Sequence, residues 1–154
     1  MKKLVLATAI AAATTMSMTA QAQEVGTFDI DVNVVASCQL VANPVNFGDV
    51  DAFADIDAIT AAAPATLDVT CTNGAGYDIA LGHTGQLTHA TAPAVTYSLF
   101  QDAGFLTVWN DTTDTLAATG NGAIQNYDVF AQLAIDNTTE IGAYTGTVTV
   151  TVTF

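Results

Sequence analysis

The chain has 154 residues, of which 51% are hydrophobic and only 11% are charged. Its two cationic side chains, Lys2 and Lys3, stand at the start, against 15 Asp and Glu residues and a formal net charge of −13. From residue 4 onward nothing can neutralise phosphates, which argues against nucleic-acid binding and against any site that needs an Arg clamp or a Lys nucleophile. The apolar content predicts a folded globular domain and not an acidic disordered tail.

The first 22 residues have the pattern of an export signal. A basic start precedes an apolar run over residues 4–13, and small residues follow at Ala20 and Ala22. This pattern predicts a signal peptide at 1–22, cleaved after Ala22, and a mature chain that works outside the cytoplasm. The apolar run is shorter than a membrane-spanning helix requires, so we do not expect a membrane anchor.

The two cysteines, Cys38 and Cys71, are expected to form a disulfide. An isolated pair in an oxidising compartment is typical of one structural bridge. A metal pair or a reactive thiol is disfavoured, because the sequence has no Cys-x-x-Cys motif and no His near either cysteine. Closing this loop would stabilise the fold by about 3–4 kcal/mol.

The mature chain alternates apolar and polar residues in short runs, which is the pattern of β-strands. Strands are predicted at 26–34, 45–47, 65–71, 77–81, 95–100, 105–109, 127–135 and 144–154, with turns at 73–74, 101–104 and 121–122. Residues 51–65 are ambiguous: we expect a surface loop between two sheets, and one or two turns of helix are the alternative. Many short strands in a single domain predict an all-β sandwich.

The first and last predicted strands are long and amphipathic, and neither contains Lys or Pro. Soluble monomers normally protect such exposed strand edges with these residues. Two interpretations follow. Both strands pack within their own domain, or the N-terminal strand of one chain completes the sheet of the next by strand addition.

Several segments together resemble the spore coat U domain family, which includes subunits of archaic chaperone–usher pili. They are the amphipathic strand that runs into Cys38, Asn46-Phe47-Gly48, residues 67–74 (LDVTCTNG), Tyr77-Asp78-Ile79, residues 97–102 (YSLFQD), Trp109 and residues 142–150 (GAYTGTVTV). The resemblance covers nearly the whole mature chain. Members often carry Gly-Arg in place of part of residues 130–132, and Gly in place of Asn110. These departures concern loops and subunit contacts and not the fold.

The resemblance implies a donor strand segment at 23–36 and a pilin domain at 37–154, an incomplete immunoglobulin-like sandwich that lacks its final strand. A periplasmic chaperone would lend a strand, and an outer-membrane usher would exchange it for the donor segment of an identical subunit. The product would be a head-to-tail filament at the cell surface, a fimbrium for adhesion and biofilm formation. The implied donor residues are Gly26, Phe28, Ile30, Val32 and Val34. The implied acceptor-groove strand carries Tyr144, Val148, Val150, Val152 and Phe154.

No group of residues predicts catalysis, a cofactor or a metal site, so we expect a protein that is not an enzyme. His83 and His89 stand six residues apart, and we interpret them as loop or surface residues. The acidic run Asp49, Asp51, Asp55 and Asp57 lacks the Gly and terminal Glu of an EF-hand, and predicts a solvated loop with calcium binding as the alternative.

Two functions other than a pilus subunit remain open from the sequence. One is a secreted, self-contained β-sandwich binding module, which would be a stable monomer. The other is a small outer-membrane β-barrel, because a terminal Phe154 after an alternating strand is typical of such barrels. The shortness of the other strands and a bridge between Cys38 and Cys71 disfavour the barrel.

Overall fold

The computed structural model describes residues 23–53 and 59–154. It divides at Asn33 into an N-terminal segment and a domain, Val34–Phe154. The predicted signal peptide and two residues of the acidic run, Asp55 and Asp57, lie outside the described residues.

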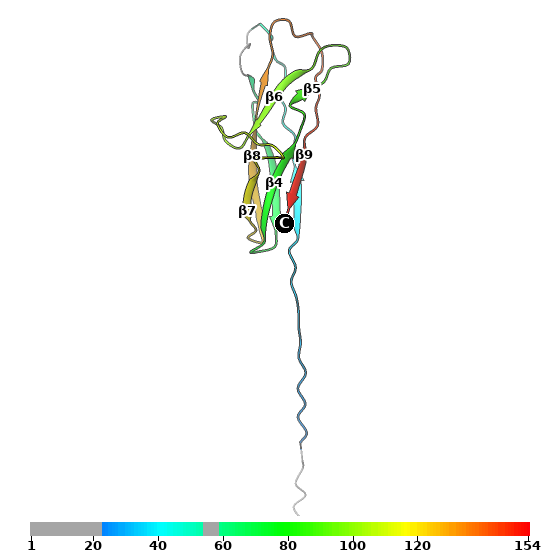
Figure 1. Cartoon of the computed structure of the whole chain (residues 1–154), viewed down its shortest axis with the longest axis vertical. Coiled ribbons are helices and arrows are strands. Elements are labelled where there is room, and N and C mark those ends of the chain that lie inside the picture. Colours follow the sequence, from blue (N-terminus) through cyan, green and yellow to red (C-terminus); the bar gives the residue numbers. More distant parts are fainter. Residues whose placement is uncertain (1–22, 54–58) are drawn as a thin grey trace, which may run out of the picture. The chain divides into compact units, whose positions relative to one another are not determined.

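The described part of the domain contains nine β-strands and no helix, which confirms the all-β prediction (Figure 1). The strands are β1 (Cys38–Ala42), β2 (Ile59–Thr60), β3 (Ala65–Cys71), β4 (Gly76–Gly82), β5 (Gln86–Leu87), β6 (Val95–Phe100), β7 (Leu116–Thr119), β8 (Ile124–Ala134) and β9 (Thr149–Thr153). One sheet has the order β1-β3-β8-β6-β5, with β2 also paired to β8, and the other has the order β7-β4-β9. All pairings are antiparallel.

The two sheets pack face to face because their strands bury every second residue. The inward side chains of β3 and β4 expose at most 8% of their surface, and they are Ala65, Leu67, Val69, Cys71, Tyr77, Ile79 and Leu81. Trp109 is fully buried with them, and its indole Nε1 donates a hydrogen bond of 3.0 Å to the carbonyl oxygen of Ile79 in β4. The core therefore occupies the space between the sheets, as an immunoglobulin-like sandwich requires.

The predicted strand at 105–109 is wrong, because the chain forms a capped loop there. The carboxylate of Asp102 accepts hydrogen bonds from the backbone N–H groups of Gly104 (2.9 Å), Leu106 (3.3 Å) and Thr107 (2.7 Å). The bond from Thr107 is the main reason why the pKa of Asp102 lies below its ordinary value. Phe105 adopts a left-handed φ of 55°, which interrupts an extended strand.

Two further strand predictions needed correction. Residues 45–47 form no strand, although Val45 and Phe47 pack against the core from an irregular segment. The closing strand is shorter than predicted: β9 begins at Thr149, and before it the backbone of this segment forms a bridge between Thr145 and Thr88. The strands β1, β2, β5 and β7 were not predicted; each has only two to five residues.

Candidate functional site

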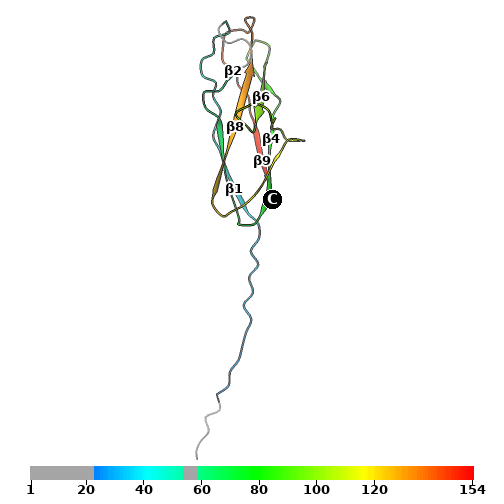
Figure 2. The same cartoon turned by 90° about the vertical axis from the view of Figure 1, so that its left-hand side faces the viewer.

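The two strands β1 and β9 each have one unpaired edge. Within the described residues, β1 pairs only with β3 and β9 pairs only with β4. The two strands come close to each other without forming a ladder (Figure 2). The facing backbone groups are therefore left without strand partners, which is the situation that strand addition resolves.

Side chains along these two edges are less buried than those elsewhere in the core. The inward residues that are only half-buried are Cys38 and Leu40 on β1 and Val148, Val150 and Val152 on and before β9. The corresponding positions on β3 and β4 are fully buried. We call the surface formed by these half-buried side chains and the edges of β1 and β9 the acceptor groove.

One end of the acceptor groove is lined by Gly146, Leu87 and Tyr97. A Cβ atom placed on Gly146 would lie 2.8 Å from Leu87 Cδ2 and 3.8 Å from Tyr97 Cε1, so these two side chains cover one side of the Gly146 backbone. The Tyr97 hydroxyl is buried, and it has no hydrogen-bond partner among the described residues. Burial raises the pKa of this hydroxyl, so it stays protonated at neutral pH.

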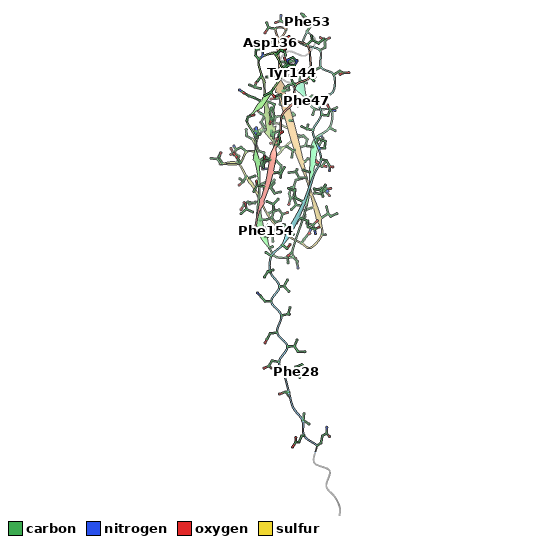
Figure 3. All side chains as sticks on the ribbon, turned by 90° about the vertical axis from the view of Figure 1, so that its right-hand side faces the viewer. Phe28, Phe47, Phe53, Asp136, Tyr144 and Phe154 are labelled. Atoms are coloured by element: carbon green, nitrogen blue, oxygen red, sulfur yellow. A yellow bond between two sulfur atoms is a disulfide. The ribbon has the colours of Figure 1, made fainter. Side chains whose placement is uncertain are left out.

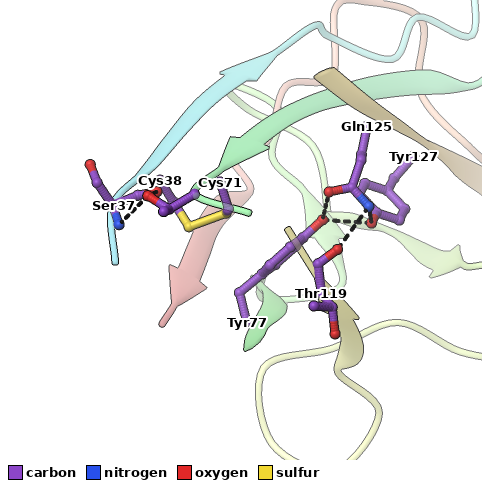
Figure 4. Close-up of a disulfide and its surroundings, with 8 residues drawn as sticks. Ser37, Cys38, Cys71, Tyr77, Thr119, Gln125 and Tyr127 are labelled. Atoms are coloured by element: carbon purple, nitrogen blue, oxygen red, sulfur yellow. Dashed lines mark hydrogen bonds between the residues drawn. A yellow bond between two sulfur atoms is a disulfide. The ribbon is translucent and has the colours of Figure 1, made fainter. Parts of the chain in front are cut away.

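The disulfide lies at the other end of the acceptor groove, where β1 begins. Cys38 and Cys71 are directly opposite in the β1–β3 ladder, with Cα atoms 4.1 Å apart, and their sulfur atoms are bonded (Figure 4). Beside them, Ser37 N–H donates to Thr72 Oγ1 (3.1 Å) and Thr72 N–H donates to the Ser37 carbonyl oxygen (2.9 Å). The start of β1 is therefore held to β3 by both covalent and hydrogen bonds.

A group of polar side chains joins the two sheets near the disulfide (Figure 4). The hydroxyl oxygens of Tyr77 and Tyr127 lie 2.6 Å apart, and Tyr77 also donates to Gln125 Oε1 at 3.1 Å. Gln125 Nε2 donates to the carbonyl oxygen of Thr119. Burial, followed by the contact with Tyr127, raises the pKa of Tyr77 far above its ordinary value. These contacts fix the spacing of β4 and β8 at this end of the sandwich.

The N-terminal segment carries the residues that we predicted as a donor strand. Residues 23–37 belong to no strand in the described part of the chain. Its side chains stand alternately on the two sides of an extended backbone, as Figure 3 shows around Phe28. The large residues of one side, Phe28, Ile30, Val32 and Val34, expose 75–87% of their surface. A run of apolar residues this exposed is typical of an interaction site.

The predicted acceptor residues do not all lie in one environment. Val148, Val150 and Val152 line the acceptor groove, and Phe154 follows β9 with 58% of its surface exposed. Tyr144 lies apart from β9, where its ring stacks on His89 at a centroid distance of 4.8 Å. The sequence analysis missed Leu40, although the alternation of Cys38, Leu40 and Ala42 could have identified it.

The histidines and the acidic run make ordinary local contacts. Nδ1 of His83 accepts a hydrogen bond from Gly85 N–H, and Nδ1 of His89 accepts one from Ala92 N–H. Asp51 accepts from the backbone N–H of Phe53. Among residues 23–53 and 59–154, no three His, Cys, Asp or Glu side chains are grouped so that they could hold a metal ion.

The described strands define an immunoglobulin-like β-sandwich in which β1 and β9 each keep one edge unpaired. The chain belongs to the Spore Coat Protein U domain family, whose profile matches residues 24–151. The family resemblance drawn from the sequence is thereby confirmed. No curated protein matches the sequence. The described residues include no helix long and apolar enough to cross a membrane.

One solved structure with a similar fold is the crystal structure of the CsuC–CsuE chaperone–tip adhesion subunit pre-assembly complex, from archaic chaperone–usher Csu pili of Acinetobacter baumannii. The matched chain is 20% identical, with a TM-score of 0.58, and the match covers 79% of this chain and 40% of that one. This chain thus spans about two fifths of its counterpart, and the likeness concerns the fold.

Proposed function

We propose that this protein is a structural subunit of an archaic chaperone–usher pilus that polymerises by donor-strand exchange. Membership of the Spore Coat Protein U domain family and the similar fold in a Csu pilus complex support this proposal. The main observation behind the proposal is that one chain carries both open strand edges and an exposed segment that could pair with them. Among the described residues β1 and β9 each keep one edge unpaired, and the chain carries an exposed, alternating segment at 26–34 that would pair with such edges.

The same chain therefore contains a donor segment and an acceptor groove, so that identical copies can bind one another. The donor residues are Gly26, Phe28, Ile30, Val32 and Val34. The acceptor is the groove beside residues 144–154, together with β1. A donor and an acceptor on different surfaces of one chain form a head-to-tail contact, and such contacts build open filaments.

The proposed direction of the donor strand is argued from the two ends of the sandwich. Cys38 at the start of β1 pairs with Cys71, and Thr153 at the end of β9 pairs with Asp78. Both pairs flank the turn between β3 and β4, so β1 begins and β9 ends at the same end. A donor antiparallel to β9 enters there and leaves at the opposite end, where the domain that follows it has room. A parallel donor would crowd its domain against the end from which the acceptor's own donor segment departs.

Burial of four large side chains supplies most of the attraction in this joint. At about 1.5–3 kcal/mol for each exposed apolar side chain, Phe28, Ile30, Val32 and Val34 contribute roughly 6–12 kcal/mol before entropy costs. The backbone ladders to β1 and β9 add a smaller net term. Such a joint dissociates slowly, as a fibre requires.

The proposal includes the cellular route. The chain is exported to the periplasm, a chaperone lends a strand to the acceptor groove, and an outer-membrane usher replaces it with the donor segment of the next copy. The assembled fibre stands at the cell surface and serves adhesion and biofilm formation. The role is structural and does not involve catalysis.

Polymer formation by the full chain tests this function. Cells that produce the chain with its chaperone and usher should yield high-molecular-weight polymers that stay intact in detergent when the sample is not boiled. Changing Ile30→Asp and Val32→Asp together should leave only monomer, because both charges would be buried in the groove. The matched control, Asp31→Asn with Asn33→Asp, changes the opposite face and should still polymerise. A well-folded, stable monomer from the unchanged chain would instead favour a secreted binding module.

A further inference from the structure

The loop between β6 and β7 presents an apolar tip to solvent. It stands out from the side of the domain (Figure 1). At this tip Leu106 exposes 86% of its surface and Val108 exposes 42%. The ring of Phe105 meets those of Phe100 and Phe130 edge to face, at centroid distances of 5.4 and 6.4 Å. Together these side chains form an apolar surface that we call the lateral patch.

Hydrogen bonds fix the shape of this loop. The carboxylate of Asp102 accepts bonds from the backbone N–H groups of Leu106 and Thr107, and Gln101 N–H donates to the carbonyl oxygen of Thr107 at 2.9 Å. Phe105 adopts a left-handed φ of 55°, which is unfavourable for a bulky side chain. An apolar tip that is already held in place loses little conformational entropy when a partner covers it.

The proposed joint leaves the lateral patch uncovered. Phe100 and Phe130 are paired neighbours on β6 and β8, and the residues beside them, Leu99 and Ala131, point into the core. The two phenylalanines therefore lie on the outer face of the large sheet. In the order β1-β3-β8-β6-β5, two strands separate β6 from β1, beside which the donor strand would dock. Every copy in a fibre would thus expose this patch.

The charge of the chain restricts which partner can cover the lateral patch. After Lys3 the sequence contains 15 Asp and Glu residues and no Lys or Arg. A cationic partner would be attracted to these carboxylates and would gain nothing from an apolar loop. Two copies of the chain have no Lys or Arg with which to form salt bridges, so an attractive contact between them has to be largely apolar. The lateral patch supplies such a contact.

We propose that the lateral patch joins neighbouring fibres side by side, with the patch of one copy against the same patch of a copy in the other fibre. This inference rests on the proposed function, and it adds the surface through which fibres associate. A two-fold contact brings identical residues together, so Leu106 of one copy lies next to Leu106 of the other.

Repetition along the fibre makes such a small contact effective. One loop tip and two sheet residues cover much less than the roughly 800 Å² per partner of a standard protein interface, so single copies should not dimerise. Between two fibres, each contact that forms raises the effective concentration for the next one. The like charges of the fibres oppose the contact. Because the Debye length falls from about 30 Å at 0.01 M salt to about 8 Å at 0.15 M, bundling should increase with salt.

A substitution at the loop tip tests the contact and leaves the core unchanged. Leu106→Gln makes the exposed tip polar, and Ile141→Gln is the matched control, since Ile141 exposes 95% of its surface on a different loop. Purified fibres of the unchanged chain at about 0.15 M salt should form side-by-side bundles in electron micrographs and sediment at low speed. Leu106→Gln should lower the sedimented fraction about fivefold or more, and Ile141→Gln should change it less than about twofold.

A single cysteine at the tip tests whether the contact is two-fold. Leu106→Cys gives each copy one free thiol, because Cys38 and Cys71 are bonded to each other. After mild oxidation in air and boiling in detergent without reductant, fibres of this variant should yield a covalent dimer and no larger product. Two controls should yield little dimer at the same chain concentration. They are fibres of Ile141→Cys, and the monomer that combines Leu106→Cys with Ile30→Asp and Val32→Asp.

The outcomes separate the lateral contact from the proposed function. Detergent-resistant polymers that stay dispersed at about 0.15 M salt would overturn the contact and leave donor-strand exchange in place. Equal bundling of Leu106→Gln and the unchanged chain would also overturn it, as would equal dimer from the fibrous and monomeric forms of Leu106→Cys. Loss of bundling in Leu106→Gln without a dimer in Leu106→Cys fibres would contradict the two-fold arrangement. Failure of the unchanged chain to form polymers would refute the proposed function itself.

Discussion

The side chain of Ile30 offers the most direct quantitative test of the joint. It lies at the middle of the donor face, and 82% of its surface is exposed in the single chain. Docking would therefore remove nearly the whole side chain from water. Truncating a buried Ile to Ala in a well-packed core costs about 2–5 kcal/mol. A groove bounded by only two strands can close partly around the change, so we expect about 2–3 kcal/mol for Ile30→Ala.

This loss should appear in the rate at which fibres fall apart. At 1.4 kcal/mol for each factor of ten, Ile30→Ala should speed dissociation roughly 25- to 150-fold, because changes within one interface act mainly on the off-rate. The measurement is the release of monomer from purified fibres in detergent at a fixed temperature, followed over time by electrophoresis.

Asp29→Ala is the matched control, because Asp29 belongs to the opposite face of the donor segment and is exposed. It should change the release rate by less than about threefold, as surface substitutions usually do. The reasoning would be refuted if both variants released monomer at the same rate. It would also be refuted if Ile30→Ala behaved like the unchanged fibre.

Two further predictions concern the stability of the domain itself. Changing both Cys38 and Cys71 to Ser removes a bridge across a sequence separation of 33 and should lower the free energy of unfolding by about 3–4 kcal/mol, measured with urea; a loss below about 1 kcal/mol would contradict this chain-entropy argument. Backbone N–H groups, chiefly that of Thr107, hold the pKa of Asp102 below its ordinary value. This carboxylate therefore stabilises the domain above about pH 4, the pKa of an unfolded carboxyl, and the stabilisation is lost as the pH falls through the folded value. Asp102→Asn should lower the unfolding temperature at neutral pH and make it decline less steeply between about pH 5 and pH 2. If the unfolding temperature of the variant declined as steeply as that of the unchanged domain, this role of Asp102 would be contradicted.

Local sequence patterns were sufficient where alternation and burial coincide. The strands at 65–71 and 95–100 were predicted at their observed bounds, and the turn at Asn73-Gly74 was predicted where Gly74 adopts a φ of 84°. The strand predicted at 127–135 is β8, which starts three residues earlier at Ile124. These segments bury one face against the opposite sheet, so the period of two in their sequence reports directly on their environment.

Local patterns failed where contacts outside the segment itself decide the backbone. Residues 105–109 are mostly apolar, as in a buried strand, but the carboxylate of Asp102 accepts hydrogen bonds from the N–H groups of Leu106 and Thr107, and Phe105 adopts a left-handed φ. Val45 and Phe47 are apolar because they cover the core and not because they pair in a sheet. The strand β7 has the short sequence LAAT, and it is recognised as a strand only by its pairing with β4.

The sequence alone determined that the protein is an all-β domain with one disulfide, and that residues 26–34 carry a strongly amphipathic pattern. These properties depend on residue type and on spacing along the chain. Only the tertiary structure decided that β1 and β9 keep open edges and that the side chains between them, such as Leu40 and Val150, are half-buried. The pairing of strands depends on residues far apart in the chain, and periodicity within one strand carries no information about which neighbour is missing.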